Sequence, residues 1–194
     1  MTPFIAKLVW WAGIVGWYVI RIPHERRSRK TPIAMRNEPV RDMVLLAISF
    51  TGLFVIPVTY VVTGVPRLAD YAFEPALAWL GTAVFALSLA LFYRTHRDLG
   101  RFWSVTLEIR ETHQLITTGI YRHVRHPMYS AFFLWAAAQT LLLPNLVAGL
   151  AGLAGFGTLF AFRLPREERM MEERFGEAYR AYAAATKRII PWIF

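Results

Sequence analysis

The stretch GIYRHVRHPMYSAFFLW, residues 119–135, brings two arginines and two histidines directly against an apolar run. Pro127 suits the first turn of a helix, because a proline at that position sacrifices no helical hydrogen bond. Ionisable side chains at such a border either lie in water or hold a ligand. The stretch therefore predicts a helix that enters an apolar phase from a polar surface where binding groups gather.

The composition of the whole chain indicates a membrane protein. Of its 194 residues, 56% are hydrophobic, more than a soluble domain of this length readily buries. Five apolar runs approach the roughly 17 to 25 residues that a transmembrane helix takes. The expected fold class is therefore an all-α polytopic membrane protein with five transmembrane helices, a cytoplasmic loop region and a C-terminal helix. The runs lie at residues 4–20, 43–62, 76–93, 130–143 and 146–162.

Local signals refine the expected spans and connections. The first run lacks a small-residue cleavage site, so we expect a retained span and not a removed signal peptide. The last two runs meet at Pro144-Asn145, which predicts a tight helical hairpin, with a single kinked helix as the alternative. Pro165 and the two glutamates that follow it predict a separate C-terminal helix. Segment 21–41 contains three prolines and is expected to be a basic loop along anionic headgroups.

Basic residues gather in three segments between the apolar runs. Of 22 lysines and arginines, 20 lie in residues 21–41, 94–125 and 163–188, and the formal net charge is +9. This positive-inside pattern predicts that the N-terminus lies outside and the C-terminus in the cytoplasm. It accounts for the charge without nucleic acid, which we do not expect as a partner. Arginine outnumbers lysine 19 to 3 and cysteine is absent, which favours a prokaryotic plasma membrane.

Three groups of ionisable residues approach the hydrocarbon: segment 93–129, Arg163 and the pair Glu167-Glu168. Each also has an ordinary explanation. An interfacial arginine can extend along its helix to water, and acidic residues stabilise a helix N-terminus. Arginine, histidine and tyrosine are common anchors at membrane surfaces. Composition alone therefore leaves the function open.

A metal site is one candidate for these polar groups. His123 and His126 stand three residues apart, and Glu167 and Glu168 could complete a set of ligands. The chain has five histidines in total, however, and neither an HxxxH nor an HxxHH box. The number of available ligands is the first requirement of a metal site, so we expect no bound metal.

Motifs in a fixed order carry a more specific signal. HQLITTGIYRHVRHPMY (113–129), RLPREE (163–168) and EERFGEAYRAY (172–182) follow one another in the C-terminal half. Together they resemble the isoprenylcysteine carboxyl methyltransferase family and the related membrane phospholipid methyltransferases. The resemblance implies that S-adenosylmethionine binds between the cytoplasmic loop and the C-terminal helix. It also implies a lipophilic methyl acceptor, such as a prenylated one, that enters from the lipid bilayer.

The resemblance further implies roles for individual residues. Glu167 matches the acid of an R-x-x-x-E pattern and is expected to take the ammonium group of the cofactor. Arg163 matches the arginine that faces the carboxylate of the substrate, and these two are the expected catalytic residues. The other implied cofactor contacts are His113, Gln114, Leu115, Ile116, Tyr121, His126, Pro127, Met128 and Tyr129, with Glu108 near a further contact position.

The expected organisation is a single membrane methyltransferase domain, 1–194. Residues 1–75 are expected to form a two-span anchor region, and 76–194 a catalytic core with cofactor-binding segments 94–129 and 163–194. The expected activity is carboxyl O-methylation of a prenylcysteine-like acceptor. This reaction needs no general base, because carboxyl groups have pKa values of about 3.3–4.3 and are already ionised.

Two alternative functions stay open at this level. One is N-methylation of a phospholipid amine, which would require Glu168 or a histidine to act as a base. The other is a non-catalytic membrane scaffold that uses its basic face on anionic lipid, with binding that weakens as salt is added.

Overall fold

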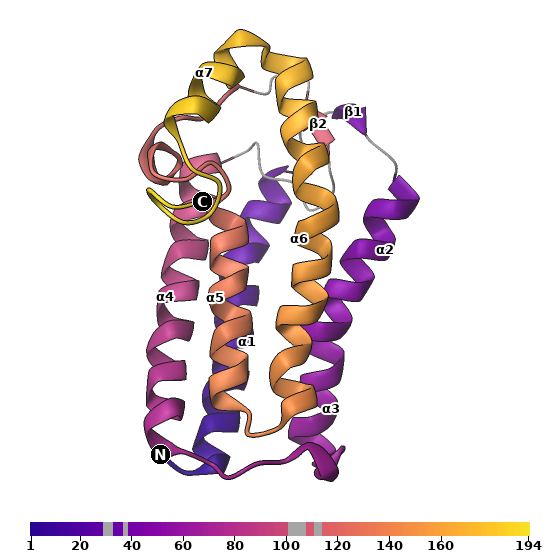
Figure 1. The fold of residues 1–194 in the computed structure, drawn as a ribbon, viewed down its shortest axis with the longest axis vertical. Helices are drawn as coiled ribbons and strands as arrows, with labels where there is room; N and C mark the ends of the chain where they lie inside the picture. The colour runs from indigo at the N-terminus through magenta and orange to yellow at the C-terminus, as the bar shows by residue number, and fades with distance from the viewer. Residues whose placement is uncertain (29–32, 37–38, 101–107, 111–113) are drawn as a thin grey trace.

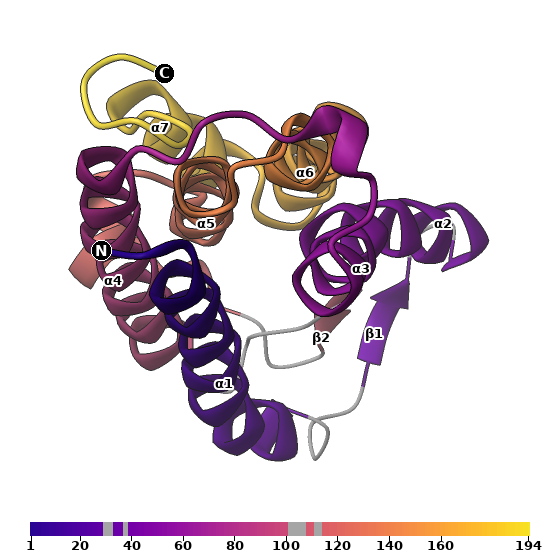
Figure 2. The same ribbon diagram turned by 90° about the horizontal axis from the view of Figure 1, so that it is seen from below.

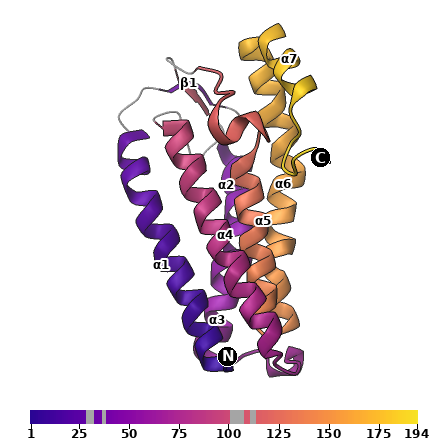
Figure 3. The ribbon, with the colours of Figure 1, turned by 90° about the vertical axis from the view of Figure 1, so that its left-hand side faces the viewer.

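The protein is a bundle of long helices capped at one end by short elements (Figure 1). The computed structural model describes residues 1–28, 33–36, 39–100, 108–110 and 114–194. In two views, the paired strands, α7 and the C-terminal loop lie at one end of the bundle (Figures 1 and 3). We call this end the polar cap. The ends of the basic segments lie at the cap, while the turn between α5 and α6 lies at the opposite end.

Helices account for nearly all of the regular structure that the structure describes. The N-terminal elements are α1 (Pro3–Ser28), β1 (Ile33–Arg36), α2 (Pro39–Phe50), the π-helical turn η1 (Thr51–Val55), α3 (Ile56–Thr63) and the short 3-10 helix η2 (Arg67–Ala69). The C-terminal elements are α4 (Pro75–Leu99), β2 (Glu108–Arg110), the 3-10 helix η4 (Gly119–Arg122), α5 (Pro127–Leu142), α6 (Leu146–Phe175) and α7 (Glu177–Ala185).

Four helical stretches in the described part of the chain are long and apolar enough to cross a membrane. These are Pro3–Glu25, Val40–Thr63, Pro75–Leu99 and Leu146–Phe175. The second joins α2, η1 and α3 into one continuous rod. Helix α5 has 16 residues, fewer than the roughly 20 that span a bilayer. The chain is thus a multi-pass membrane protein, and the expected fifth crossing stays a prediction.

The predicted hairpin between α5 and α6 is confirmed. Asn145 begins α6: its side chain accepts a hydrogen bond from the Ala148 backbone N–H at 2.8 Å and satisfies the helix start. The Asn145 amide also donates to the Pro66 carbonyl and to Asp70, each at 2.7 Å. The hairpin is therefore hydrogen-bonded to the loop that joins α3 to α4. These bonds fix the position of α5 and α6 along the axis of the bundle.

The predicted helix boundary at Pro165 is wrong, because α6 continues without a break to Phe175. Proline removes one backbone donor from a helix interior. Pro165 lies on the exposed face, while Leu164 and Met170 around it are buried against the bundle. Packing on both sides thus favours one helix over two. The helix ends instead at Gly176, whose φ of +53° suits a residue without a side chain.

The predicted loop at 21–41 is also wrong in part. Helix α1 extends to Ser28, and β1 pairs antiparallel with β2, with Arg36 opposite Glu108. A strand of four residues carries almost no sequence signal, and its partner lies more than 70 residues away. The pairing joins the N-terminal helices to the segment that precedes α5.

Aromatic side chains fill the centre of the bundle and hold α5 in place. The Trp135 ring lies 5.6 Å from Trp17 of α1, 5.2 Å from Phe54 and 5.2 Å from Phe85 of α4, measured between ring centroids. The Ser88 hydroxyl of α4 donates to the Ala131 carbonyl of α5 at 2.7 Å. Viewed along the bundle, α5 lies between α4 and α6 (Figure 2). The first turn of α5 is therefore rigidly placed at the polar cap.

Glycines allow the continuous rod of α2, η1 and α3 to approach α6 closely. A Cβ atom on Gly155 would lie 2.8 Å from the Ile48 carbonyl oxygen, and one on Gly52 would overlap the Ala151 carbonyl. Two helices can meet backbone to backbone only where such side chains are missing. This contact sets the separation of α2 and α6 where Ile48 meets Gly155.

We expect Gly155→Ala to weaken the fold, because the new methyl group forces α2 away from α6. The free energy of unfolding should fall by about 1–3 kcal/mol, the usual cost of overpacking. Gly157→Ala is the matched control: its Cβ meets nothing within 4 Å, and alanine in a helix gains up to about 1 kcal/mol over glycine. Thermal unfolding in detergent measures both, and equal transitions would contradict the close approach.

Candidate active site

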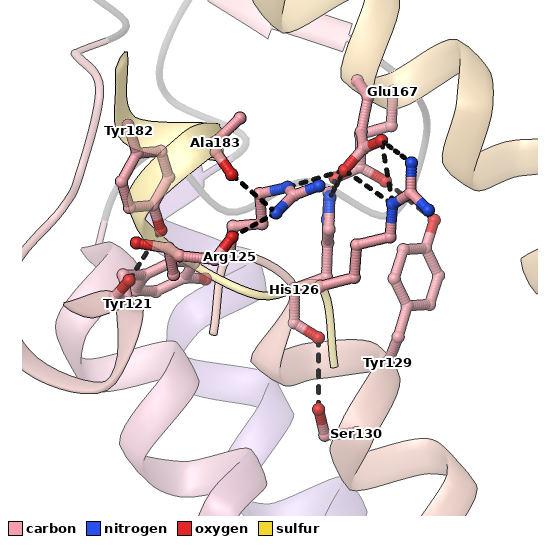
Figure 4. Close-up of polar contacts among 11 residues, drawn as sticks. Tyr121, Arg125, His126, Tyr129, Ser130, Glu167, Tyr182 and Ala183 are labelled. Atoms are coloured by element: carbon pink, nitrogen blue, oxygen red, sulfur yellow. Dashed lines mark hydrogen bonds and ion pairs between the residues drawn. The ribbon is translucent and has the colours of Figure 1, made fainter. Parts of the chain in front are cut away.

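The start of α5 and the cap end of α6 bring four predicted or candidate residues together (Figure 4). The Tyr129 hydroxyl donates to Glu167 Oε2 at 2.7 Å. The His126 ring lies between the two glutamates, with Nδ1 at 3.8 Å from Glu167 Oε1 and Nε2 at 3.3 Å from Glu168 Oε1. Tyr129 and His126 are both buried. The predicted meeting of these segments is therefore present.

Helix geometry explains why these side chains share one place. Pro127 occupies the first turn of α5, so His126 precedes the helix and Tyr129 follows one turn later on the same side. On α6, Arg163 and Glu167 stand four residues apart and so share one face. Local sequence thus sets the spacing within each helix, while the bundle brings the two helices together.

Glu168 is the centre of a cluster of opposite charges. Its Oε1 atom accepts from Arg125 Nε at 2.7 Å, and its Oε2 atom accepts from Arg188 Nη2 at 3.0 Å. His126 is the third partner, at 3.3 Å. A carboxylate at an apolar border is stable when its oxygens are satisfied in this way. Glu168, whose role the sequence left open, therefore holds the site together.

Glu167 has a different environment from its neighbour. Its side chain is 36% exposed, against 16% for Glu168. Tyr129 occupies Oε2, and the partner of Oε1 is the more distant His126. Of the two glutamates, Glu167 is the one that can accept a further donor from a ligand.

The C-terminal tail, residues 186–194, contacts the start of α5 next to the cluster around Glu168. The sequence did not predict this contact. The backbone N–H groups of Arg125 and His126 donate to the carbonyls of Lys187 and Arg188, at 2.8 and 2.9 Å. The Ser130 hydroxyl donates to the Ile189 carbonyl at 2.6 Å. Every chain has such backbone groups, so no sequence pattern marks this contact. The only visible signal was a basic residue, Arg188, shortly after α7.

Two tyrosines join the loop before α5 to α7. The Tyr182 hydroxyl donates to the Tyr121 carbonyl at 2.6 Å. Burial raises the pKa of Tyr121 well above its ordinary value, and the charge of Glu167 raises it further. Burial also raises the pKa of Tyr182. Both hydroxyls are therefore neutral at physiological pH, and the assignment of Tyr121 to the site stays a prediction.

Arg163 lies at the edge of this arrangement with its side chain 11% exposed, and it has a partner that the sequence did not suggest. Its Nη1 atom lies 3.4 Å from Oδ1 of Asp42, in the first turn of α2. Asp42 was visible in the sequence as an acid at the start of an apolar run, but only the tertiary contact reveals its partner.

The other predicted site residues differ in burial, and two of them are not fully described by the structure. Pro127 is buried, and Met128 is partly buried against the core. Gln114 is exposed and Leu115 and Ile116 are half-buried in a segment without regular structure. His113 and the Glu108 side chain lie outside the described residues. Whether this loop segment joins Glu167 in one site stays a prediction.

The arrangement is suited to binding and orienting a charged molecule. It offers a largely buried cation, Arg163, and a more accessible anion, Glu167, on one face of α6, with the Tyr129 side chain alongside. Among the described side chains, no group of three or more histidines and acids is placed to hold a metal ion. The site also lies where the apolar helices α5 and α6 meet the polar cap.

Comparisons with known proteins agree on one family. The model of the isoprenylcysteine carboxyl methyltransferase (ICMT) family matches residues 79–173. "Protein-S-isoprenylcysteine O-methyltransferase B" of Arabidopsis thaliana is 33% identical over 136 residues, which cover 65% of this chain and 68% of that protein. "Protein-S-isoprenylcysteine O-methyltransferase" of Rattus norvegicus is 23% identical over 192 residues, 92% of this chain and 65% of that protein.

A solved structure shares the fold. The eukaryotic intramembrane Ras methyltransferase ICMT is 27% identical and superimposes with a TM-score of 0.52 over 81% of this chain. The match covers 54% of that chain, so the protein spans about half the length of the solved relative. The structural match covers 81% of the chain, which is more than residues 79–194 contain. It therefore includes helices before residue 79, where the match of the family model begins.

We expect Glu168→Gln to destabilise the protein, because Arg125 and Arg188 lose their shared counter-charge. The free energy of unfolding should fall by about 1–3 kcal/mol, the usual cost of leaving hydrogen-bonding groups without their charged partner. Glu177→Gln is the control, since that carboxylate is 81% exposed and pairs with Arg180 at the surface, a contact worth about 1 kcal/mol or less. Equal melting temperatures in detergent would contradict a structural role for Glu168.

Proposed function

Because the chain belongs to the isoprenylcysteine carboxyl methyltransferase family, we propose that it methylates the carboxylate of a lipophilic, prenylcysteine-like acceptor with S-adenosylmethionine as the methyl donor. It would thus be a protein-S-isoprenylcysteine carboxyl O-methyltransferase in type. One observation carries the proposal: α6 presents a largely buried cation, Arg163, and a more accessible anion, Glu167, which accepts a hydrogen bond from Tyr129 at the membrane end of the cap.

The residues of the site fit the proposed donor. S-adenosylmethionine has an ammonium group, and Glu167 keeps an accessible carboxylate whose position Tyr129 fixes. Charge-assisted hydrogen bonds of this kind are among the strongest in proteins. The His126 and Tyr129 rings offer faces to a sulfonium or a purine. We assign Tyr121 and the loop residues from His113 to Ile116 to the nucleoside part of the donor.

Arg163 would bind the acceptor. A guanidinium can hold a carboxylate through two parallel hydrogen bonds, which fixes the direction of the attacking oxygen. When bound, S-adenosylmethionine would supply an electrophilic methyl group to that oxygen. The chain's own task is to align the two molecules and to exclude water, and the site's burial between helices suits both.

The environment of Glu168 favours a carboxylate acceptor over an amine. A phospholipid amine has to lose a proton before it attacks, so it requires a base. Glu168 is engaged with Arg125, His126 and Arg188. A carboxylate that already neutralises these cations is a poor base. A carboxylate acceptor has no such requirement.

For the membrane arrangement we propose five spans with the polar cap in the cytoplasm. The ends of all three basic segments meet at the cap, as the positive-inside pattern requires (Figure 1). Helix α5 would be the fifth crossing, enclosed between α4 and α6. The division into an anchor region, 1–75, and a catalytic core, 76–194, is part of this proposal. The named relatives are eukaryotic, so a prokaryotic plasma membrane rests on composition alone.

The orientation can be tested with single cysteines, because the natural chain has none. Thr63 lies at the end opposite the cap and Thr118 lies at the cap, and both are exposed. In sealed vesicles, a membrane-impermeant thiol reagent should label Thr63→Cys from the outside and Thr118→Cys only from the cytoplasmic side. Labelling of both from one side would contradict the arrangement.

We expect the two charged residues of α6 to separate into two roles. Arg163→Ala should retain affinity for S-adenosylhomocysteine while methyl transfer falls by about 100-fold or more, since an acceptor contact of about 2–3 kcal/mol is lost. Glu167→Gln should weaken S-adenosylhomocysteine binding by about 10-fold or more, or roughly 1.4 kcal/mol. Titration calorimetry and a methyl-transfer assay in detergent measure these effects.

Arg180→Ala is the control for that comparison, since Arg180 pairs with Glu172 and Glu177 on the surface of the cap. It should change neither quantity by more than about twofold. If the wild-type protein bound no S-adenosylhomocysteine at millimolar concentration, the proposed function would be wrong. Salt-dependent lipid binding without methyl transfer would support the scaffold alternative.

A further inference from the structure

The short helix η4, which leads into α5, is hydrogen-bonded to two other helices. The backbone N–H of Ile120 donates to Oδ2 of Asp98, in α4, at 2.8 Å. The carbonyl of the next residue, Tyr121, accepts from the Tyr182 hydroxyl of α7 at 2.6 Å (Figure 4). Tyr121 is buried between these two contacts in sequence and carries its ring into the cap. Two successive residues of η4 are therefore fixed, one by α4 and one by α7.

Asp98 occupies an unusual place for an acid. It lies in the last turn of α4, where the helix dipole favours cations and disfavours a carboxylate. Its side chain is only 12% exposed, and it receives donors from the Ile120 N–H and from Arg97 Nε, at 2.8 and 3.3 Å. Thr118, the residue that begins η4, provides no side-chain cap of its own. Asp98 therefore caps η4 from a helix that lies 22 residues earlier in the chain.

Gly119 allows the carboxylate to come this close. Its φ is +63°, a backbone conformation that favours glycine because a side chain would be strained there. A Cβ atom at this position would also overlap the carboxylate of Asp98. The turn at Gly119 and the bond from Ile120 to Asp98 thus form one local arrangement, and this arrangement sets where η4 begins.

Building on the proposed function, in which Tyr121 contacts the nucleoside part of the donor, we propose that Asp98 is a positioning residue for donor binding. Through its bond to Ile120, Asp98 holds η4 where Tyr121 can meet S-adenosylmethionine, and Asp98 itself touches no ligand. The affinity for a ligand falls with the fraction of molecules whose site is in the binding arrangement. Without the bond to Asp98, η4 leaves that arrangement more often, and the donor binds more weakly.

The inference adds a residue of α4 to the site, since Asp98 was not among the individual residues that the motifs implied. It also predicts that the two ligands respond differently. Arg163, the proposed contact of the acceptor, lies on α6 and pairs with Asp42 of α2 at 3.4 Å. These elements are distinct from α4 and η4, so loss of Asp98 should affect the donor and spare the acceptor.

The test measures two affinities on the full chain in detergent, one for S-adenosylhomocysteine and one for a prenylcysteine analogue with a free carboxylate. Asp98→Ala should weaken S-adenosylhomocysteine binding about 10-fold and leave the affinity for the analogue within about twofold. Asp98→Asn keeps an oxygen that can accept from Ile120, so its loss of S-adenosylhomocysteine affinity should stay within about threefold. Glu172→Ala is the control: that carboxylate is 50% exposed and pairs with Arg180 at the surface, so neither affinity should change.

A second variant tests the contact from the side of η4. Gly119→Ala places a methyl group against the Asp98 carboxylate, and it should weaken S-adenosylhomocysteine binding by about 10-fold or more. In an Asp98→Ala background that obstacle is absent and only the unfavourable φ remains. The same substitution should then weaken binding by no more than about threefold further, a coupling that a double-mutant cycle measures.

Four results would overturn the inference. Unchanged S-adenosylhomocysteine affinity in Asp98→Ala would show that η4 keeps its place without the bond, and equal weakening of both ligands would show that Asp98 only supports the fold. An equal loss in Asp98→Asn and Asp98→Ala, or an undiminished effect of Gly119→Ala in the Asp98→Ala background, would show that the contact with η4 is not the cause. Wild-type protein that bound no S-adenosylhomocysteine would instead contradict the proposed function, and the inference with it.

Discussion

A charge stays buried where lipid gives way to water only if opposite charges or hydrogen-bond donors surround it. Glu168 meets this condition through Arg125, His126 and Arg188, which come from the start of α5 and from the C-terminal tail. The cluster therefore joins three segments that are far apart in the chain. At the cap, this junction holds the start of α5 against α6 and the C-terminal tail.

The adjacent residues Glu167 and Glu168 of α6 have different roles because their surroundings differ. Glu168 is enclosed by cations and is fixed as part of the scaffold, whereas Glu167 keeps an accessible carboxylate beside Tyr129. Arg163 shows the same principle with the opposite sign, since this largely buried cation pairs with Asp42 from another helix. The family resemblance lies in the C-terminal half, but the electrostatic balance of the site uses the whole bundle.

The success of the sequence predictions depended on how local each signal was. Pro127 predicted the start of α5, and Pro144-Asn145 predicted the turn between α5 and α6, because turns and helix starts are decided by a few neighbouring residues. The prediction from Pro165 was wrong because proline acts only on the helix around it. Burial of residues on both sides kept α6 continuous. The strand pairing at the cap was missed because its two short partners are distant in sequence.

The sequence by itself determined that the chain enters a membrane, which end of the bundle is basic, and which motif residues share a helix face. Those properties depend on composition and on periodicity, which act within a few turns of helix. Only the tertiary structure decided that Glu168 is enclosed, that the tail closes over the start of α5, and that Asp42 reaches Arg163. These contacts join groups from different helices through backbone atoms and single charges, whose partners depend on how the helices pack.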